Sequence, residues 1–171
     1  MNNYNTIFNE ILKKYGNSEK WSGSIFEKMK LISNTHVGSV GQDYIVELCR
    51  ILKLNIELPP VNRSPWDIKI EGICFELKTA SEDTNNNFQF NHIRYHRNYD
   101  ALICLGVAPN NLYFNLWSKA DLTTGKAGKL VSMERQANAS YKLTKNSKDL
   151  YSIENFDNLI NEFINKFKSN Q

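Results

Sequence analysis

Residues 67–78 constrain the fold of this chain more than any other segment does. Apolar and polar side chains alternate on both sides of Glu71-Gly72; the apolar positions are Ile68, Ile70, Ile73, Phe75 and Leu77, and the polar ones are Asp67, Lys69, Cys74, Glu76 and Lys78. Successive side chains of a β-strand point to opposite faces of the sheet. The alternation therefore predicts two strands joined by a turn at Glu71-Gly72, with one apolar and one polar face.

A two-residue turn fixes which side chains of this hairpin lie opposite each other. Its register pairs Ile70 with Ile73, Lys69 with Cys74, Ile68 with Phe75, Asp67 with Glu76, and Trp66 with Leu77. Directly opposed side chains have Cβ atoms roughly 5 Å apart, and like charges placed there cost up to about 1 kcal/mol. Two carboxylates followed by Lys78 on the same face suit the binding of a divalent cation by oxygen ligands.

The residues alone leave two other interpretations of this face open. The charged side chains can form a solvated, mutually neutralised sheet face, which is common in antiparallel hairpins. A three-residue loop without a bulge would instead shift one strand and separate the two acids. Glu71 is a poorer first turn residue than Asn or Asp where φ must be positive, so the cation site depends on this turn.

The spacing of these residues resembles a known nuclease signature. Asp67, eight intervening residues and Glu76-Leu77-Lys78, with Pro65 just upstream, resemble the PD-(D/E)XK motif of restriction endonucleases and related DNA-cleaving enzymes. The small residues Thr79-Ala80-Ser81 fit its commoner form, whereas Trp66 separates the proline from the aspartate. The resemblance implies that Asp67, Glu76 and Lys78 are catalytic. It also implies that Asp67, Glu76 and the Leu77 carbonyl bind one or two Mg²⁺ ions per active site.

Many members of that family carry a further acid on the helix before the first catalytic strand. Here the expected helix spans about residues 40–54, with Glu47 the nearest match for a water-mediated contact to the metal and Asp43 the next. The family often has this acid directly after a glycine, where this chain has Gly41-Gln42. A solvated helix face is the competing interpretation of Glu47.

Two segments downstream of the hairpin have the composition of DNA-contacting surfaces. Residues 85–99 combine aromatic, base-reading and phosphate-binding side chains, and we expect DNA contacts from Gln89, Asn91, His92, Arg94, His96 and Arg97. Residues 125–148 carry the strongest local excess of positive charge, and we expect DNA contacts from Lys129, Arg135, Asn138 and Lys142. The alternatives are a polar helix over 88–99, with His92 and His96 spaced to bind a metal, and a solvated hairpin over 125–148.

The remaining pattern predicts helices around a sheet. Apolar stripes at helical spacing run through residues 4–15, 25–32 and 40–54, and a last one spans 153–168 with Asn155 as a candidate N-cap. The apolar run 101–107 and the segment 112–117 predict a buried strand and its paired neighbour. The order helix, hairpin, helix, strand, strand is the order expected of the nuclease core.

Composition places few limits on function. The chain has 171 residues, 23% of them charged and 41% hydrophobic, with a net charge of +3, which fits one globular domain and leaves an anionic partner unopposed. Cys49, Cys74 and Cys104 lack the spacing of a zinc site or a disulfide framework, so we expect buried, reduced thiols. Because a leader and a long apolar run are missing, we expect a cytoplasmic protein with no membrane contact.

The sequence thus predicts a single α/β domain over residues 1–171, with a restriction-endonuclease-like core in which α-helices flank a mixed β-sheet. Its parts are N-terminal helices (1–54), a catalytic hairpin (65–79), recognition segments (85–99 and 125–148) and a C-terminal helix (153–168). The resemblance implies a sequence-specific type II restriction endonuclease that hydrolyses double-stranded DNA as a homodimer. The alternatives are a structure-specific nuclease, such as a Holliday-junction resolvase, and a catalytically inactive DNA-binding module.

Overall fold

The computed structural model describes residues 11, 18–60, 64–134 and 139–169. Its helical elements are α2 (Ser18–Trp21), η1 (Glu27–Lys30), α3 (Asn34–Ile51), α4 (Lys119–Thr123), η2 (Ser147–Asp149), η3 (Ile153–Asn155) and α5 (Phe156–Ser169). Its strands are β1 (Ile56–Glu57), β2 (Ile68–Ile70), β3 (Ile73–Ser81), β4 (Asn87–Ile93), β5 (Ala101–Val107), β6 (Leu112–Ser118), β7 (Leu130–Ser132), β8 (Tyr141–Asn146) and β9 (Tyr151–Ser152). None of these described helices is long and apolar enough to span a membrane.

The strands form a six-stranded sheet and a smaller three-stranded sheet within the described residues. The order in the central sheet is β1-β2-β3-β5-β6-β9, and the order in the smaller one is β4-β8-β7. β3 and β5 run parallel, whereas the other neighbouring strands are antiparallel. The structure is therefore mixed α/β, with a mixed central sheet flanked by helices, as the sequence predicts.

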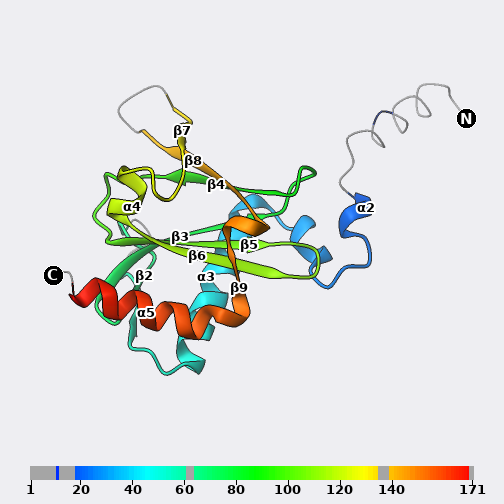
Figure 1. Ribbon diagram of the computed structural model, residues 1–171. Helices are drawn as coiled ribbons and strands as arrows, with labels where there is room; N and C mark the ends of the chain where they lie inside the picture. The colour runs from blue at the N-terminus through cyan, green and yellow to red at the C-terminus, as the bar shows by residue number, and fades with distance from the viewer. Residues whose placement is uncertain (1–10, 12–17, 61–63, 135–138, 170–171) are drawn as a thin grey trace, which may run out of the picture.

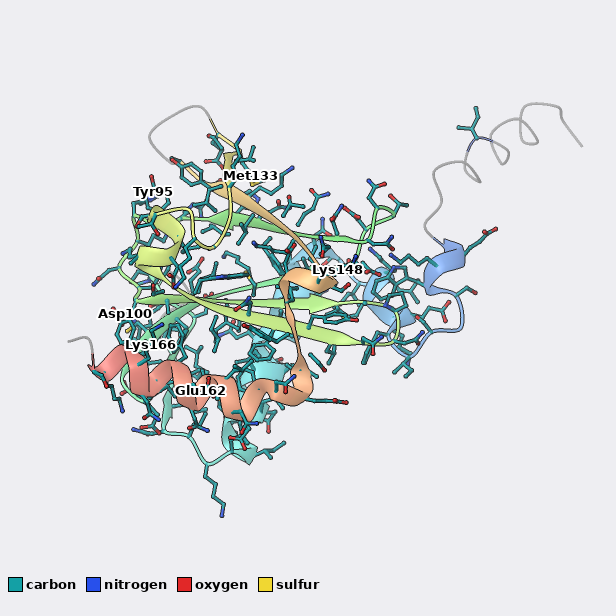
Figure 2. All side chains as sticks on the ribbon, viewed as in Figure 1. Tyr95, Asp100, Met133, Lys148, Glu162 and Lys166 are labelled. Carbon is teal, nitrogen blue, oxygen red and sulfur yellow. The ribbon has the colours of Figure 1, made fainter. Side chains whose placement is uncertain are left out.

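Three layers follow from this topology (Figure 1). α3 and α5 cover one face of the central sheet, and the three-stranded sheet with α4 covers the other. Figure 2 shows Tyr95 and Met133 on the side of the smaller sheet and Glu162 and Lys166 on α5, at the opposite side of the molecule. The central sheet is thus buried on both faces, and β5 is buried along its whole length.

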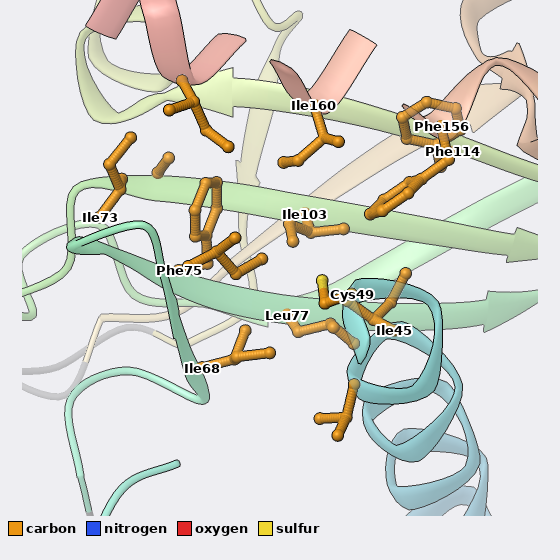
Figure 3. Packing of buried hydrophobic residues seen from close by; sticks show 14 residues of the cluster. Ile45, Cys49, Ile68, Ile73, Phe75, Leu77, Ile103, Phe114, Phe156 and Ile160 are labelled. Atoms are coloured by element: carbon orange, nitrogen blue, oxygen red, sulfur yellow. The ribbon is translucent and has the colours of Figure 1, made fainter. Parts of the chain in front are cut away.

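Alternation along β3 divides the core into two clusters. Ile73, Phe75 and Leu77 point toward α3 and α5, where they pack with residues such as Ile45 and Ile160 (Figure 3). The intervening side chains of β3 point toward the smaller sheet, where the second cluster contains the aromatic rings of Phe88, Phe90, Tyr99 and Trp117. This division places Glu76 and Lys78 between the two sheets.

The hairpin has the register that a two-residue turn predicts. Ile70 pairs with Ile73, Lys69 with Cys74, and Ile68 with Phe75. Glu71 and Gly72 have φ values of 50° and 88°, as the tight hairpin turn requires. The side chain of Glu71 offsets its unfavourable backbone, because its carboxylate accepts the Asn55 N–H at 2.7 Å and its own N–H donates to the Asn55 carbonyl.

Several elements differ from the sequence-based expectation. Residues 88–99 do not form a helix, since β4 covers Asn87–Ile93 and pairs with β8. The helix expected over 25–32 is only the 3₁₀ turn η1, and Ile25 and Leu31 are exposed. α3 starts at Asn34, six residues earlier than expected, behind the N-cap Ser33. The helix expected over 4–15 lies outside the described residues except for Ile11.

Smaller corrections concern single side chains. Ser152, rather than Asn155, caps the 3₁₀ turn that leads into α5. Trp66 does not face Leu77 but packs in the second cluster, because the β2–β3 ladder ends at Ile68. The three cysteines are free thiols, but Cys74 is only half-buried.

Candidate active site

Asp67 continues the β2 side of the hairpin where the regular ladder stops. Its N–H donates to the Phe75 carbonyl at 2.8 Å, and its Oδ2 accepts the Leu77 N–H at 2.8 Å. The carboxylate therefore accepts the hydrogen bond that a backbone carbonyl would accept if the β2–β3 ladder continued past Ile68. Both contacts flank Glu76 on β3, which brings the two acids of the signature together.

The edge of β3 beyond this point is open. Among the described residues, β2 pairs with β3 only as far as Phe75, while β5 pairs along β3 to Ser81. The N–H and C=O of one strand residue point to the same side, so the Leu77 carbonyl shares the side of its N–H and of Asp67. Thr79 and Ser81 present their backbone groups to this side as well, because a strand repeats every second residue.

Glu76 and Lys78 lie on the face of β3 that the smaller sheet covers. Glu76 is 4% exposed, and Lys78 forms an ion pair with it at 2.5 Å between Nζ and Oε1. Burial raises the pKa of the Glu76 carboxyl, the nearby Asp67 charge raises it further, and Lys78 and Arg97 oppose the shift. A buried acid beside a second acid and a lysine is an arrangement typical of functional sites.

Tyr99 lies on the same side of the sheet. Its ring is 2% exposed, and its hydroxyl has no hydrogen-bond partner in the part of the chain that the structure describes. Burial, followed by the Glu76 charge, raises the pKa of this phenol. Tyr99 therefore forms part of the surroundings that keep Glu76 out of bulk water.

A cleft of ≈ 450 Å³ lies along the open edge of β3. Its lining comes from three elements, namely the N-terminal half of α3, β3 from Leu77 to Ser81, and β4 with the turn before it. Lys78 lines it and is 21% exposed in its side chain, so its ammonium is accessible to a ligand in the cleft.

α3 approaches β3 closely beside this cleft. A Cβ on Gly41 would lie 1.8 Å from the Thr79 Oγ1, so only glycine fits at this position. Gln42, the next residue, donates from its carboxamide to the Asp67 carbonyl at 3.1 Å. Gln42 has no role in the sequence-based prediction, although it directly follows a glycine, the position where the resembled family often has an acid.

The structure does not bring Glu47 to this site. Its side chain is 61% exposed and forms an ion pair with Arg50 on the outer side of α3. Asp43, the second acid predicted for this role on the same helix, is exposed as well. The solvated-face interpretation of Glu47 thus agrees with the structure.

The residues expected to read DNA fall into two groups. Gln89, Asn91 and His92 are exposed on β4 and line the cleft. His92 sits at an irregularity of β4 with a φ of 57°, and its ring lies 3.4 Å from the Ser140 Oγ and 3.8 Å from the Glu134 Oε1. The second group, Arg94, His96 and Arg97, follows β4 outside the cleft lining.

The alternative of a metal site at His92 and His96 loses its basis, because no helix spaces the two rings. Among the described residues, moreover, no three His, Cys, Asp or Glu side chains are grouped to hold a metal ion. In the basic segment, Lys142 lies on β8 and Lys129 is exposed just before β7. Arg135 and Asn138 lie outside the described residues.

Comparison with known proteins gives little further information. No protein-family model and no curated protein matches the chain. Among solved structures, the fold is similar to that of a bacterial homing endonuclease, with a TM-score of 0.47 and 10% sequence identity. This similarity covers 68% of this chain and 82% of that one.

Proposed function

We propose that this chain is a metal-dependent endonuclease that cleaves double-stranded DNA, with a catalytic core of the PD-(D/E)XK type. One observation carries the proposal: the Asp67 carboxylate binds the Leu77 N–H where the β2–β3 ladder ends, beside the paired Glu76 and Lys78. Two acids and a lysine thus lie together where the ladder ends, and the lysine lines the cleft along the open strand edge. A solvated, neutralised sheet face would not bury Glu76 to 4% exposure.

The donor set suits Mg²⁺. Asp67 and Glu76 offer carboxylate oxygens, and the Leu77 carbonyl shares the edge of β3 with Asp67. Mg²⁺ keeps several of its waters and is usually bound through one or two carboxylates, so this small oxygen set is sufficient for one or two ions. When bound, Mg²⁺ supplies Lewis-acid activation of the scissile phosphate and of the attacking water.

Lys78 is placed to orient the water that attacks the scissile phosphate. Its ammonium reaches the cleft and is held by the buried Glu76 carboxylate. There it donates to the attacking water to orient it and stabilises the negative charge that develops on the phosphate. Gln42 fixes the backbone of Asp67 from α3 and is a positioning residue in this scheme.

Within the class of DNA endonucleases, the proposed function is that of a sequence-specific type II restriction endonuclease. The support comes from Gln89 and Asn91, whose side chains can bind base edges in the major groove and line the same cleft as Lys78. A homodimer would place two such sites on the two strands of a palindrome. Sedimentation on cognate DNA tests this assembly, and a monomeric complex would contradict it.

Digestion of phage DNA by the purified protein in Mg²⁺ tests the function. We expect discrete fragments whose sequenced ends share one recognition site and carry 5′-phosphates. Nicking confined to branched junctions would favour the structure-specific nuclease instead. DNA binding without any cleavage would identify an inactive DNA-binding module, an outcome that the intact set of Asp67, Glu76 and Lys78 argues against.

A further inference from the structure

The segment that contains α2 and η1 is fixed to the end of the cleft farthest from Asp67. Lys20 forms an ion pair with the Glu82 Oε2 at 2.6 Å and donates to the Asp83 carbonyl and the Asn86 Oδ1. Trp21 is 1% exposed. The N–H of Phe26 donates to the Pro109 carbonyl at 3.0 Å. These contacts join the segment to the turns that follow β3 and β5.

Lys30 is the side chain of this segment that contacts a residue of the cleft lining. Its Nζ donates to the Ser81 Oγ at 2.8 Å and lies 5.0 Å from the centroid of the Trp21 ring. No carboxylate oxygen lies within 4.0 Å of this Nζ in the part of the chain that the structure describes. Lys30 thus bonds to a neutral hydroxyl, with the charges of Asp83 and Glu82 nearby but not in direct contact, whereas Lys20 pairs directly with Glu82.

Ser81 connects this lysine to the candidate active site. It lines the cleft and is the last residue of β3, on the same open edge as Leu77. Four residue steps along the extended strand separate the two, a span of roughly 13 Å. Lys30 at one end of this edge and Lys78 near the other place two ammonium groups along the cleft, whose lining also includes the Asp83 carboxylate.

We propose that Lys30, with Ser81, binds a second backbone phosphate of the DNA strand that is cleaved at Asp67, Glu76 and Lys78. The identification of the ligand as DNA rests on the proposed function. The contact adds affinity and fixes the direction of the strand along β3, but it carries no base specificity, because phosphates are the same at every step.

The salt dependence of DNA binding tests this second phosphate site. Binding of a fluorescein-labelled random-sequence duplex is measured by anisotropy in EDTA, so that no cleavage occurs. Each phosphate contact contributes about 0.9 to the slope of log K against log salt. We expect Lys30→Met to reduce the magnitude of this slope by about 0.9 and Lys30→Arg to restore it.

Lys28 provides the matched control, because it is exposed in the same 3₁₀ turn as Lys30. Lys28→Met should keep the wild-type slope, and circular dichroism should show that both variants fold. An unchanged slope in Lys30→Met, or equal losses in the two variants, would overturn the second phosphate site. If the wild type binds DNA with the expected slope but never cleaves it in Mg²⁺, the proposed function fails while the phosphate site stands.

Discussion

The two halves of β3 show how one strand can serve both stability and chemistry. From Ile73 to Phe75 the strand pairs with β2 on one edge, and β5 pairs with the other edge from Phe75 onward. From Leu77 to Ser81 only β5 pairs with it, and the other edge faces the cleft. The alternation of side chains is the same in both halves. The difference lies in β2, which ends before it reaches Leu77. The Asp67 carboxylate accepts the Leu77 N–H in its place.

This difference explains why a costly pair of acids is tolerated. The paired half supplies the apolar contacts of Ile73 and Phe75 with α3 and α5. The open half keeps Glu76 buried beside Asp67, where burial and the second charge raise the pKa of the Glu76 carboxyl. We therefore expect substitutions in the paired half to change stability alone and substitutions at the end of the ladder to change cleavage.

Substitution of Asp67 should have the largest effect. Asp67→Asn keeps an oxygen that can accept the Leu77 N–H but removes the charge, so we expect a roughly 10²- to 10³-fold loss of cleavage. Its stability should stay near that of the wild type, because the repulsion with Glu76 is removed as well. Asp67→Ala also loses the hydrogen bond and should unfold more easily by about 1–3 kcal/mol.

Plasmid cleavage in Mg²⁺ and urea denaturation separate these two effects of Asp67. Wild-type cleavage by Asp67→Asn would show that the carboxylate serves only to end the ladder. Equal stability of the Asn and Ala variants would show that the Leu77 contact is not structural.

Gly41 tests how tightly the open half is held against α3. A methyl group there would collide with Thr79, so we expect Gly41→Ala to lower the free energy of unfolding by about 1–3 kcal/mol. Gly38 lies on the same helix, and a Cβ there meets no atom within 4 Å. Gly38→Ala should therefore stabilise the protein by about 0.5–1 kcal/mol through helix propensity. Thermal denaturation that ranks the two variants equally would contradict the close contact.

The turn of the paired half should give the smallest effect. Glu71→Ala removes the acceptor of the Asn55 N–H and should cost about 1 kcal/mol. Glu71→Gln keeps that acceptor and should stay within about 0.5 kcal/mol of the wild type, because the 3.8 Å pair with Lys168 is at the surface. Both variants should cleave DNA normally in the plasmid assay. A loss of cleavage in Glu71→Gln would show that the two halves are not independent.

The hairpin could be predicted near its turn because two independent constraints agree, whereas the predicted pairs Asp67–Glu76 and Trp66–Leu77 lie beyond the end of the ladder. Alternation fixes the faces, and a turn at Glu71-Gly72 fixes the register, which the structure confirms from Ile68 to Phe75. The strand 101–107, its neighbour β6 and the C-terminal helix could be predicted for a similar reason, since each has a clear apolar pattern.

The sequence predicts a helix where β4 forms, because the alternating pattern of this strand is interrupted. Phe88 and Phe90 alternate as in a strand, but the irregularity at His92 moves Ile93 onto the buried face and imitates helical spacing. Its pairing with β8, more than fifty residues later in the chain, leaves no local signal. Lys30 could not be found from the sequence either, because its position depends on contacts with the Trp21 ring and with Ser81, which is 51 residues away in the chain.

Lys78 tests the central claim most directly, because Lys69 offers a control on the same hairpin face. Lys69 lies on β2, opposite the paired half of β3, and forms an ion pair with Glu57. Lys78 lies in the open half of β3 and pairs with Glu76. Conversion of supercoiled plasmid in Mg²⁺ should fall at least about 10²-fold in Lys78→Ala, with DNA binding in EDTA largely retained. Lys69→Ala should cleave like the wild type. Wild-type cleavage by Lys78→Ala would contradict the assignment of the active site.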